Sequence, residues 1–402
     1  MDEASAELPD LAPTFRARLP SDLPATGAWQ PGDQRGDRQF FVFGGDRRFA
    51  LEMGGSLPVL TIAYETWGEL NTDASNAVLV CHALTGDSHA AGPMSSGHLT
   101  EGWWNDFVGP GRYVDTDRYF VVCANVLGGC QGSTGPASVN PDTGRRYGAD
   151  FPVVTVRDVV RTQQRLADHL GIARWHTVVG GSMGGMQALE WSVMYPDRLR
   201  SMIVLASTAA ASPQQIAHSA VGRLAIAADP RFRGGEYYDA KPGEGPGAGL
   251  MVARQIAQIT YRTDETFARR FGRKTVDPLE NFGVWGRFEV ESYLDHHGQK
   301  LVRRFDANSY IILNRLMDLH DVGRGRGGTR RALANVRVPA LAVTISSDAL
   351  YPPRQQRELV YDLRANGVQC EYEVVDSPEG HDGFLLEHDS IGPILADFLA
   401  TV

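Results

Sequence analysis

Short apolar runs alternate with amphipathic stretches along most of the chain. The runs have the length of strands and are rich in β-formers, whereas several stretches between them carry apolar residues at helical spacing. The predicted strands lie at residues 60–67, 77–81, 119–124, 177–179, 202–206, 340–345 and 372–375, and the clearest helices lie at 157–170 and 185–194. Strands separated by helices predict a parallel sheet with crossover helices.

The pattern changes between about residues 210 and 330. Helical periodicity and polar loops replace the strand-like runs there, and residues 241–247 form a stretch rich in Gly and Pro. We interpret 210–330 as a helical cap inserted into a core made of 41–209 and 331–402. Residues 1–40 are rich in Pro, Ala, Asp and Arg without sustained periodicity, so we expect an extended or poorly ordered lead-in.

The composition of the 402-residue chain is that of a folded protein, with 43% hydrophobic and 22% charged residues. Its 48 acidic residues outnumber its 39 basic ones, and the formal net charge of −9 argues against binding to nucleic acid. The longest apolar runs fall well short of the roughly 20 residues that span a bilayer. The acidic N-terminus also lacks the basic-then-apolar order of a signal peptide. We therefore expect a cytoplasmic protein that binds neither nucleic acid nor membrane.

Neither the cysteines nor the histidines show the spacing of a metal site. The four cysteines contain no C-x-x-C pair, and we expect them to be reduced and mostly buried. His82, His89 and His98 match no ligand pattern, so no metal is predicted. The glycine-rich residues 128–135 lack the full G-x-G-x-x-G pattern, and we expect them to line a site rather than hold a dinucleotide.

Residues 180–185 read Gly-Gly-Ser-Met-Gly-Gly and follow a predicted strand directly before a predicted helix. A sharp strand-to-helix turn needs glycines on both sides of a nucleophile, because the backbone there is strained and close neighbours must lack a Cβ. This context favours Ser182 as a nucleophile over a plain tight turn. A phosphate-binding P-loop is excluded because no Lys follows the glycines.

A serine hydroxyl needs a base to remove its proton, and the base needs a carboxylate to fix its tautomer. In folds with such a turn, the acid and then the histidine follow late strands. Asp348 follows the predicted strand 340–345, and His381 follows 372–375. The rival acids are less well placed, since Asp362 falls in a helical pattern and Asp376 lies close to the histidine.

An oxyanion on the attacked carbonyl requires preorganised donors, normally the backbone N–H after the nucleophile and a second from an early strand-to-loop junction. Met183 supplies the first candidate. Leu84, in the loop directly after the predicted strand 77–81, supplies the second. This second assignment rests on position alone, and an ordinary β-to-α turn is its alternative.

Several long motifs resemble those of the homoserine O-acetyltransferases and follow one another in the same order. The motifs are HALTGDSH at residues 82–89, GWW at 102–104, NVLGGCQGSTGP at 125–136, GGSMGGMQALEW at 180–191, HDVGRG at 320–325 and GHDGFL at 380–385. The resemblance runs from about residue 55 to the C-terminus. It implies the α/β-hydrolase fold, with a mostly parallel sheet, helices on both faces and an inserted helical cap.

The resemblance also implies an activity, its substrates and an assembly. The family transfers an acetyl group from acetyl-CoA through a serine ester to the side-chain hydroxyl of L-homoserine, the first committed step of methionine biosynthesis. No cofactor is permanently bound, and acetyl-CoA is a co-substrate. Family members commonly pair through the cap helices, which implies a homodimer.

By the same resemblance, Arg254 holds the α-carboxylate of homoserine, Asp382 holds its α-ammonium group, and Tyr261 contributes a hydroxyl to the pocket. A guanidinium matches the geometry of a carboxylate, and a short acid suits an ammonium group. Tyr261 lies two helical turns after Arg254 on the same face. Residues 324–328, Arg-Gly-Arg-Gly-Gly, are interpreted as structural, with a position near the CoA phosphates as one option.

Other functions stay open from the sequence. Relatives with these motifs differ in donor and acceptor, so succinyl transfer or L-serine as acceptor is an alternative. A hydrolase, in which water attacks the acyl-enzyme, is a second alternative, and a binding protein on the same scaffold is a third. The presence of serine, acid and base argues against a binding protein.

Overall fold

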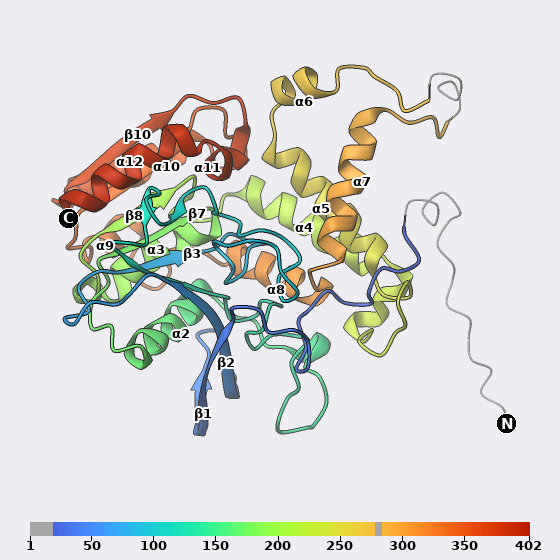
Figure 1. Ribbon diagram of the computed structural model, residues 1–402, viewed down its shortest axis with the longest axis horizontal. Coiled ribbons are helices and arrows are strands. Elements are labelled where there is room, and N and C mark those ends of the chain that lie inside the picture. The colour runs from blue at the N-terminus through green and yellow to red at the C-terminus, as the bar shows by residue number, and fades with distance from the viewer. Residues whose placement is uncertain (1–18, 278–283) are drawn as a thin grey trace.

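The computed structural model describes residues 19–277 and 284–402 and has a mixed β-sheet at its centre (Figure 1). In this described part of the chain, eight strands form the sheet in the order β1-β2-β6-β3-β7-β8-β9-β10. From β6 to β10 all neighbours are parallel, whereas β1 and β2 join at one edge by antiparallel pairing. The strands are β1 (Gln39–Ala50), β2 (Ser56–Trp67), β3 (Ala77–Cys81), β6 (Phe120–Ala124), β7 (Thr177–Gly181), β8 (Met202–Leu205), β9 (Ala340–Ile345) and β10 (Cys370–Val375), with a separate pair β4 (Val108–Gly109) and β5 (Val114–Asp115).

The central strands are buried on both faces, which explains their continuous apolar sequences. Along β3, Leu79 and Cys81 pack into one core cluster, while Val78 and Val80 pack into a second cluster across the sheet. The edge strand β1 is mostly exposed or half-buried and contains Gly, Asp and Arg. Its short apolar run at residues 40–43 is followed directly by Gly, Asp and Arg, and the sequence did not predict this strand.

Helices cover both faces of the sheet, as the sequence predicts for an α/β fold. The first core cluster takes helical residues from α2, α3, α9 and α10, and also from helices that come between β8 and β9 in the sequence; the second takes them from α11 and α12. These helices are α2 (Val156–His169), α3 (Met183–Met194), α9 (Thr329–Leu333), α10 (Pro353–Ala365), α11 (Gly383–Leu386) and α12 (His388–Thr401), with short 3-10 turns at η1 (Gly148–Asp150), η2 (Pro196–Arg198), η3 (Pro230–Gly235) and η4 (Gly380–Asp382). A capping box at Thr155 and Asp158 fixes the start of α2.

Along the chain, a group of helices comes between β8 and β9, in the segment where the sequence predicts a cap. In Figure 1 these helices stand beside the sheet. It comprises α4 (Pro213–Ala227), α5 (Gly247–Tyr261), α6 (Asp264–Arg270), α7 (Glu289–Val302) and α8 (Ala307–Asp318). Helix α5 is the middle element, because it packs against both α4 and α7. We call this group the cap.

The described part of the N-terminal lead-in is fastened to the cap and to the loop after β6. The Gly27 N–H donates to the Phe305 carbonyl (3.0 Å), and the Trp29 N–H donates to the Cys130 carbonyl (2.9 Å). A side chain at Gly245, in the Gly/Pro stretch, would overlap the backbone of Ala25, so this stretch packs directly on the lead-in. The prediction for residues 1–18 lies outside the described residues.

The four cysteines are free and buried, and burial raises the pKa of each thiol. They therefore behave as small apolar residues of the interior. Among the described residues, no helix is both long and apolar enough to cross a membrane.

Candidate active site

Ser182 occupies a strained turn between β7 and α3. Its backbone has φ 55° and ψ −122°, a combination that L-residues rarely adopt. The glycines around it are sterically required: a Cβ on Gly184 would overlap the Cys81 carbonyl oxygen, and one on Gly181 would overlap the Phe384 ring. The turn lifts the serine to the carboxyl edge of the sheet, as the sequence predicts.

The structure brings Ser182, His381 and Asp348 into one chain of hydrogen bonds. His381 Nε2 lies 2.9 Å from Ser182 Oγ, and its Nδ1 lies 2.7 Å from Asp348 Oδ2. All three side chains are buried. The carboxylate accepts from Nδ1–H, which leaves the Nε2 lone pair facing the serine hydroxyl. This arrangement can remove the serine proton.

The carboxylate of Asp348 is itself held by the backbone. Its Oδ1 accepts hydrogen bonds from the N–H groups of Leu350 (2.9 Å) and Tyr351 (2.8 Å). The rival acid Asp376 is exposed and accepts from Ser346 Oγ (2.8 Å) instead. The loop after β9 thus presents one fixed oxygen to the imidazole.

Aromatic rings enclose the imidazole of His381. Tyr351 stacks on it with ring centroids 4.9 Å apart, Phe384 lies at 5.3 Å and Tyr261 at 5.8 Å. Burial raises the pKa of both tyrosines, so their hydroxyls stay neutral hydrogen-bond donors. Tyr351 and Phe384 were not predicted, although each lies three residues after a predicted site residue.

The two predicted oxyanion donors lie on neighbouring segments, Met183 directly after Ser182 and Leu84 in the loop after β3. A Cβ on Gly184 would meet the backbone of Cys81 and His82, so the loop after β3 passes beside the first turn of α3. Within the described residues, the backbone N–H groups of Leu84 and Met183 donate to no protein acceptor. Both donors are therefore available for a substrate oxygen.

The loop at residues 82–89, which carries Leu84, is fastened from the core. Glu65 on β2 accepts from Ser88 Oγ (2.7 Å) and pairs with His89 Nδ1 (2.8 Å). The Val126 N–H donates to His82 Nε2 (3.1 Å). Sequence reasoning missed Glu65, because nothing in a strand pattern indicates a buried carboxylate.

A second tether reaches the same loop from the cap. Arg304, between α7 and α8, pairs with Asp87 (Nη1 to Oδ2, 3.3 Å) and donates to the Thr85 carbonyl. Arg304 also gives no sequence signal, because its partners are more than 200 positions away. The position of the predicted Leu84 donor therefore depends on both the core and the cap.

Glu65, His89 and His98 lie close enough to one another to be considered as metal ligands. The two imidazoles are stacked, however, with centroids 3.7 Å apart and planes at 9°. Lone pairs in two parallel ring planes cannot both point at one ion. Although burial opposes it, Glu65 raises the pKa of His89, while burial lowers the pKa of His98. This geometry favours a cluster that shares a proton, and the absence of a metal remains a prediction.

Of the predicted substrate residues, Tyr261 and Asp382 adjoin His381, and Arg254 lies beside Tyr261. The Arg254 guanidinium lies 5.4 Å from the centroid of the Tyr261 ring, and its Nη1 lies 3.5 Å from Thr85 Oγ1. Both Arg254 and Tyr261 come from α5 in the cap, whereas Asp382 belongs to the core beside His381. The site thus combines groups from both parts of the molecule.

Arg262 is a further charged residue at this point that the sequence did not indicate. Its Nη2 lies 3.2 Å from Asp382 Oδ2, and its Nη1 lies 2.5 Å from Glu379 Oε2. The carboxylate of Asp382 is therefore already paired with a cation. A substrate ammonium group would have to share this oxygen or use the other one.

A cavity adjoins the site beneath the cap. Leu84, Tyr261 and Tyr351 line it at the triad, and Gln215 and Asp318 line it between α4 and α8. The rings of Tyr261 and Tyr351 also contact His381, but Ser182, Arg254 and Asp382 are not among the residues that line the cavity.

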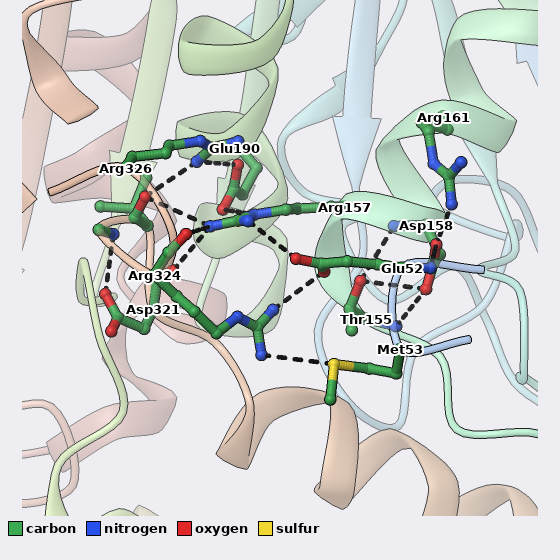
Figure 2. Close-up of polar contacts among 12 residues, drawn as sticks. Glu52, Met53, Thr155, Arg157, Asp158, Arg161, Glu190, Asp321, Arg324 and Arg326 are labelled. Carbon is green, nitrogen blue, oxygen red and sulfur yellow. Dashed lines mark hydrogen bonds and ion pairs between the residues drawn. The ribbon is translucent and has the colours of Figure 1, made fainter. Parts of the chain in front are cut away.

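Arg324 and Arg326 do not reach toward this cavity as free cations. Arg324 Nη2 pairs with Glu52 (2.9 Å), and Arg326 Nη1 pairs with Glu190 (2.8 Å). Figure 2 shows both guanidinium groups in a network with carboxylates. These contacts support the structural interpretation of this motif, and a position near the CoA phosphates stays a prediction.

Comparisons with known proteins agree with this geometry. A family model described as the α/β hydrolase fold matches residues 76–388. The homoserine O-acetyltransferase of Thermobifida fusca (strain YX) is 53% identical over 380 residues, which cover 94% of this chain and 98% of that protein. The homoserine O-acetyltransferase of Geobacter sulfurreducens (strain ATCC 51573 / DSM 12127 / PCA) is 50% identical over 366 residues, covering 91% and 98%.

Solved structures give the same picture of the fold. The homoserine O-acetyltransferase from Bacillus anthracis superposes with a TM-score of 0.83 at 30% identity, covering 90% of this chain and 97% of that one. Esterase E22 superposes with a TM-score of 0.81 at 27% identity, covering 90% and 100%. An acyltransferase and an esterase therefore share this architecture.

Proposed function

Because the chain belongs to the homoserine O-acetyltransferase family of enzymes with the α/β-hydrolase fold, we propose that it transfers an acetyl group from acetyl-CoA to the side-chain hydroxyl of L-homoserine. The reaction would be an early step of methionine biosynthesis. The observation that carries the proposal is the buried hydrogen-bonded chain from Ser182 through His381 to Asp348. It supplies the nucleophile, the base and the orienting acid that acyl transfer requires.

In the first half-reaction, His381 Nε2 takes the proton of Ser182 as Oγ attacks the thioester carbonyl of acetyl-CoA. The N–H groups of Leu84 and Met183 stabilise the negative charge on the carbonyl oxygen. The C–S bond then breaks, and the leaving thiolate takes the proton from the imidazolium. Asp348 stabilises that imidazolium and keeps the tautomer correct.

In the second half-reaction, L-homoserine enters after CoA has left. His381 removes the proton of its side-chain hydroxyl, the hydroxyl oxygen attacks the serine ester, and Ser182 Oγ leaves with that proton. Arg254 binds the α-carboxylate and Asp382 the α-ammonium group. Charge complementarity at both ends selects an amino acid over a simple alcohol.

The test is the release of free thiol from acetyl-CoA and, separately, from succinyl-CoA, each with L-homoserine or L-serine. A Ser182→Ala variant serves as control. We expect continued thiol release, beyond one equivalent per enzyme, to require acetyl-CoA, homoserine and Ser182, with O-acetylhomoserine identified by mass spectrometry. Preference for succinyl-CoA or serine would overturn the named substrates, and continued thiol release over many turnovers without any acceptor would indicate a hydrolase.

A homodimer formed through the cap is part of the proposal. Val221 and Leu224, one turn apart on α4, and Ile259 on α5 are 52%, 67% and 52% exposed, respectively, and a second cap packed there would bury them. Light scattering of the purified protein should give the mass of two chains. The mass of one chain would contradict this assembly.

A further inference from the structure

The cap is joined to the core through a narrow neck of two paired segments. Residues 208–211 enter the cap after β8, and residues 319–322 return from α8. The Ala211 N–H donates to the His320 carbonyl (2.9 Å), and the Val322 N–H donates to the Ala209 carbonyl (2.9 Å). His320 Nε2 also lies 3.0 Å from the Thr208 carbonyl. The two connections are therefore hydrogen-bonded to each other, and we call them the neck.

Arg157, on helix α2 of the core, binds the returning segment of the neck. Its Nη2 donates to the carbonyls of Asp321 (3.1 Å) and Arg324 (2.9 Å). Its Nε donates to Glu190 (3.0 Å) and its Nη1 to Glu52 (2.8 Å). Figure 2 shows this guanidinium at the centre of the network, reaching toward α3, the β1–β2 turn and the return segment at once.

Glu190 connects this network to the nucleophile. It lies on α3, the helix that begins directly after Ser182, and its side chain is 1% exposed. Its other oxygen accepts from Arg326 Nη1 (2.8 Å), and the same nitrogen donates to the Val322 carbonyl (2.9 Å). Two arginines thus tie the neck to the helix that carries the nucleophile. Ion pairs this buried hold their geometry, because breaking one leaves a charge without a partner.

We propose that Arg157 is a positioning residue that sets the cap against the nucleophile, and thereby decides whether the acyl-enzyme reacts with the acceptor or with water. The inference rests on the proposed function. The cap contributes Arg254 and Tyr261 to the site, whereas the core contributes the triad. The relative placement of these groups depends on the neck, together with the direct contacts of Arg304 and Arg262 between cap and core, and misplacement of reacting groups by about 1 Å can cost roughly a hundredfold in rate.

Two reactions compete for the same serine ester. In transfer, the homoserine hydroxyl gives its proton to His381 and forms the new ester as Ser182 is released. In hydrolysis, water gives its proton to His381, and acetate and free Ser182 result. A cap held in the correct position over the triad favours transfer, because it excludes water and orients the acceptor. The ratio of O-acetylhomoserine to acetate therefore reports the placement of the cap.

The experiment compares Arg157→Gln and Arg157→Lys with the wild type and with Arg161→Gln. Arg161 lies one turn further along α2 and pairs with the buried Asp158, but it makes no contact with the neck. We expect the product ratio to fall by about tenfold or more in Arg157→Gln, with a higher KM for homoserine. Arg157→Lys should recover part of the ratio, and Arg161→Gln should keep the wild-type ratio.

The ratio separates positioning from stability. A lower melting temperature reduces the amount of active enzyme but leaves the products of each active molecule unchanged. An unaltered ratio in folded Arg157→Gln would therefore overturn the proposal. If that variant does not fold, Arg326→Gln breaks the second connection to the neck and is expected to lower the ratio in the same direction, so an unaltered ratio there overturns it too. A wild type that never acetylates homoserine would instead refute the proposed function.

Discussion

Replacing Asp348 by Asn changes one atom and should reverse the tautomer of His381. In the native protein, Oδ1 accepts from the N–H groups of Leu350 and Tyr351, and Oδ2 faces His381 Nδ1 at 2.7 Å. The Asn oxygen should stay with the two backbone donors, since an NH2 group there would face two N–H groups. The amide nitrogen then points at Nδ1, which must accept, and the proton moves to Nε2. Nε2–H cannot take the proton of Ser182.

The expected loss is large for activity and small for stability. A triad in the wrong tautomer loses about 10⁴ in kcat, which corresponds to about 5.4 kcal/mol at 1.36 kcal/mol per tenfold change in rate. The variant keeps the two backbone hydrogen bonds and weakens one to the imidazole, so the free energy of unfolding should fall by no more than about 3 kcal/mol. A protein of this size should remain folded.

The assay is the initial rate of homoserine-dependent thiol release, with the melting temperature measured beside it. Asp376→Asn is the matched control, because this acid lies near His381 in sequence but is exposed and bonded to Ser346. The control should keep near wild-type activity. If Asp348→Asn retained more than about a tenth of the wild-type kcat, or if the control lost activity instead, the tautomer argument would be refuted.

Three further predictions follow from individual contacts. Arg254→Lys should raise the KM for homoserine by about tenfold with a smaller change in kcat, because a lysine cannot bind the carboxylate with two nitrogens; equal KM values would exclude a carboxylate contact. Gly184→Ala should lower the free energy of unfolding by about 3 kcal/mol in denaturant titrations, because its Cβ would overlap the Cys81 carbonyl; an unchanged midpoint would argue against this turn. Burial, with Arg254 adding to it, lowers the pKa of His297 to about 4. The unfolded chain therefore binds more protons than the folded protein between pH 6.5 and 4, and the free energy of unfolding falls as the pH falls. The melting temperature of His297→Gln should drop less between pH 7 and 5 than that of the wild type, and an equal drop would contradict this cause.

The sheet and the triad positions could be predicted from local sequence. Central parallel strands are buried on both faces, so they read as short apolar runs that are easy to recognise. Ser182 was found because a nucleophile on a sharp turn needs small neighbours. Asp348 and His381 followed from their places after late strands, and the structure places all three within hydrogen-bonding distance. Their catalytic roles remain predictions.

The rest depends on contacts between distant residues. Strand β1 is an edge strand whose apolar run at residues 40–43 gives way to an exposed polar half, so its full length is defined by its pairing with β2. Arg157 and Glu190 meet across 33 positions, and Arg262 reaches Asp382 across the boundary between cap and core. From the sequence alone, a charged residue in a helical pattern is expected to face solvent, and only the structure shows its buried partner. Arg254 and Tyr261 were identified through family resemblance alone.

The central claim is that the acetyl group passes through Ser182, and the most direct measurement is the intact mass of the protein after rapid mixing with acetyl-CoA alone. The account predicts one added acetyl group, mapped to Ser182 by peptide analysis and absent from Ser182→Ala. Adding L-homoserine should remove it and yield O-acetylhomoserine. Homoserine acetylated at the wild-type rate without any acetyl group on Ser182, or with the group on another residue, would contradict the account.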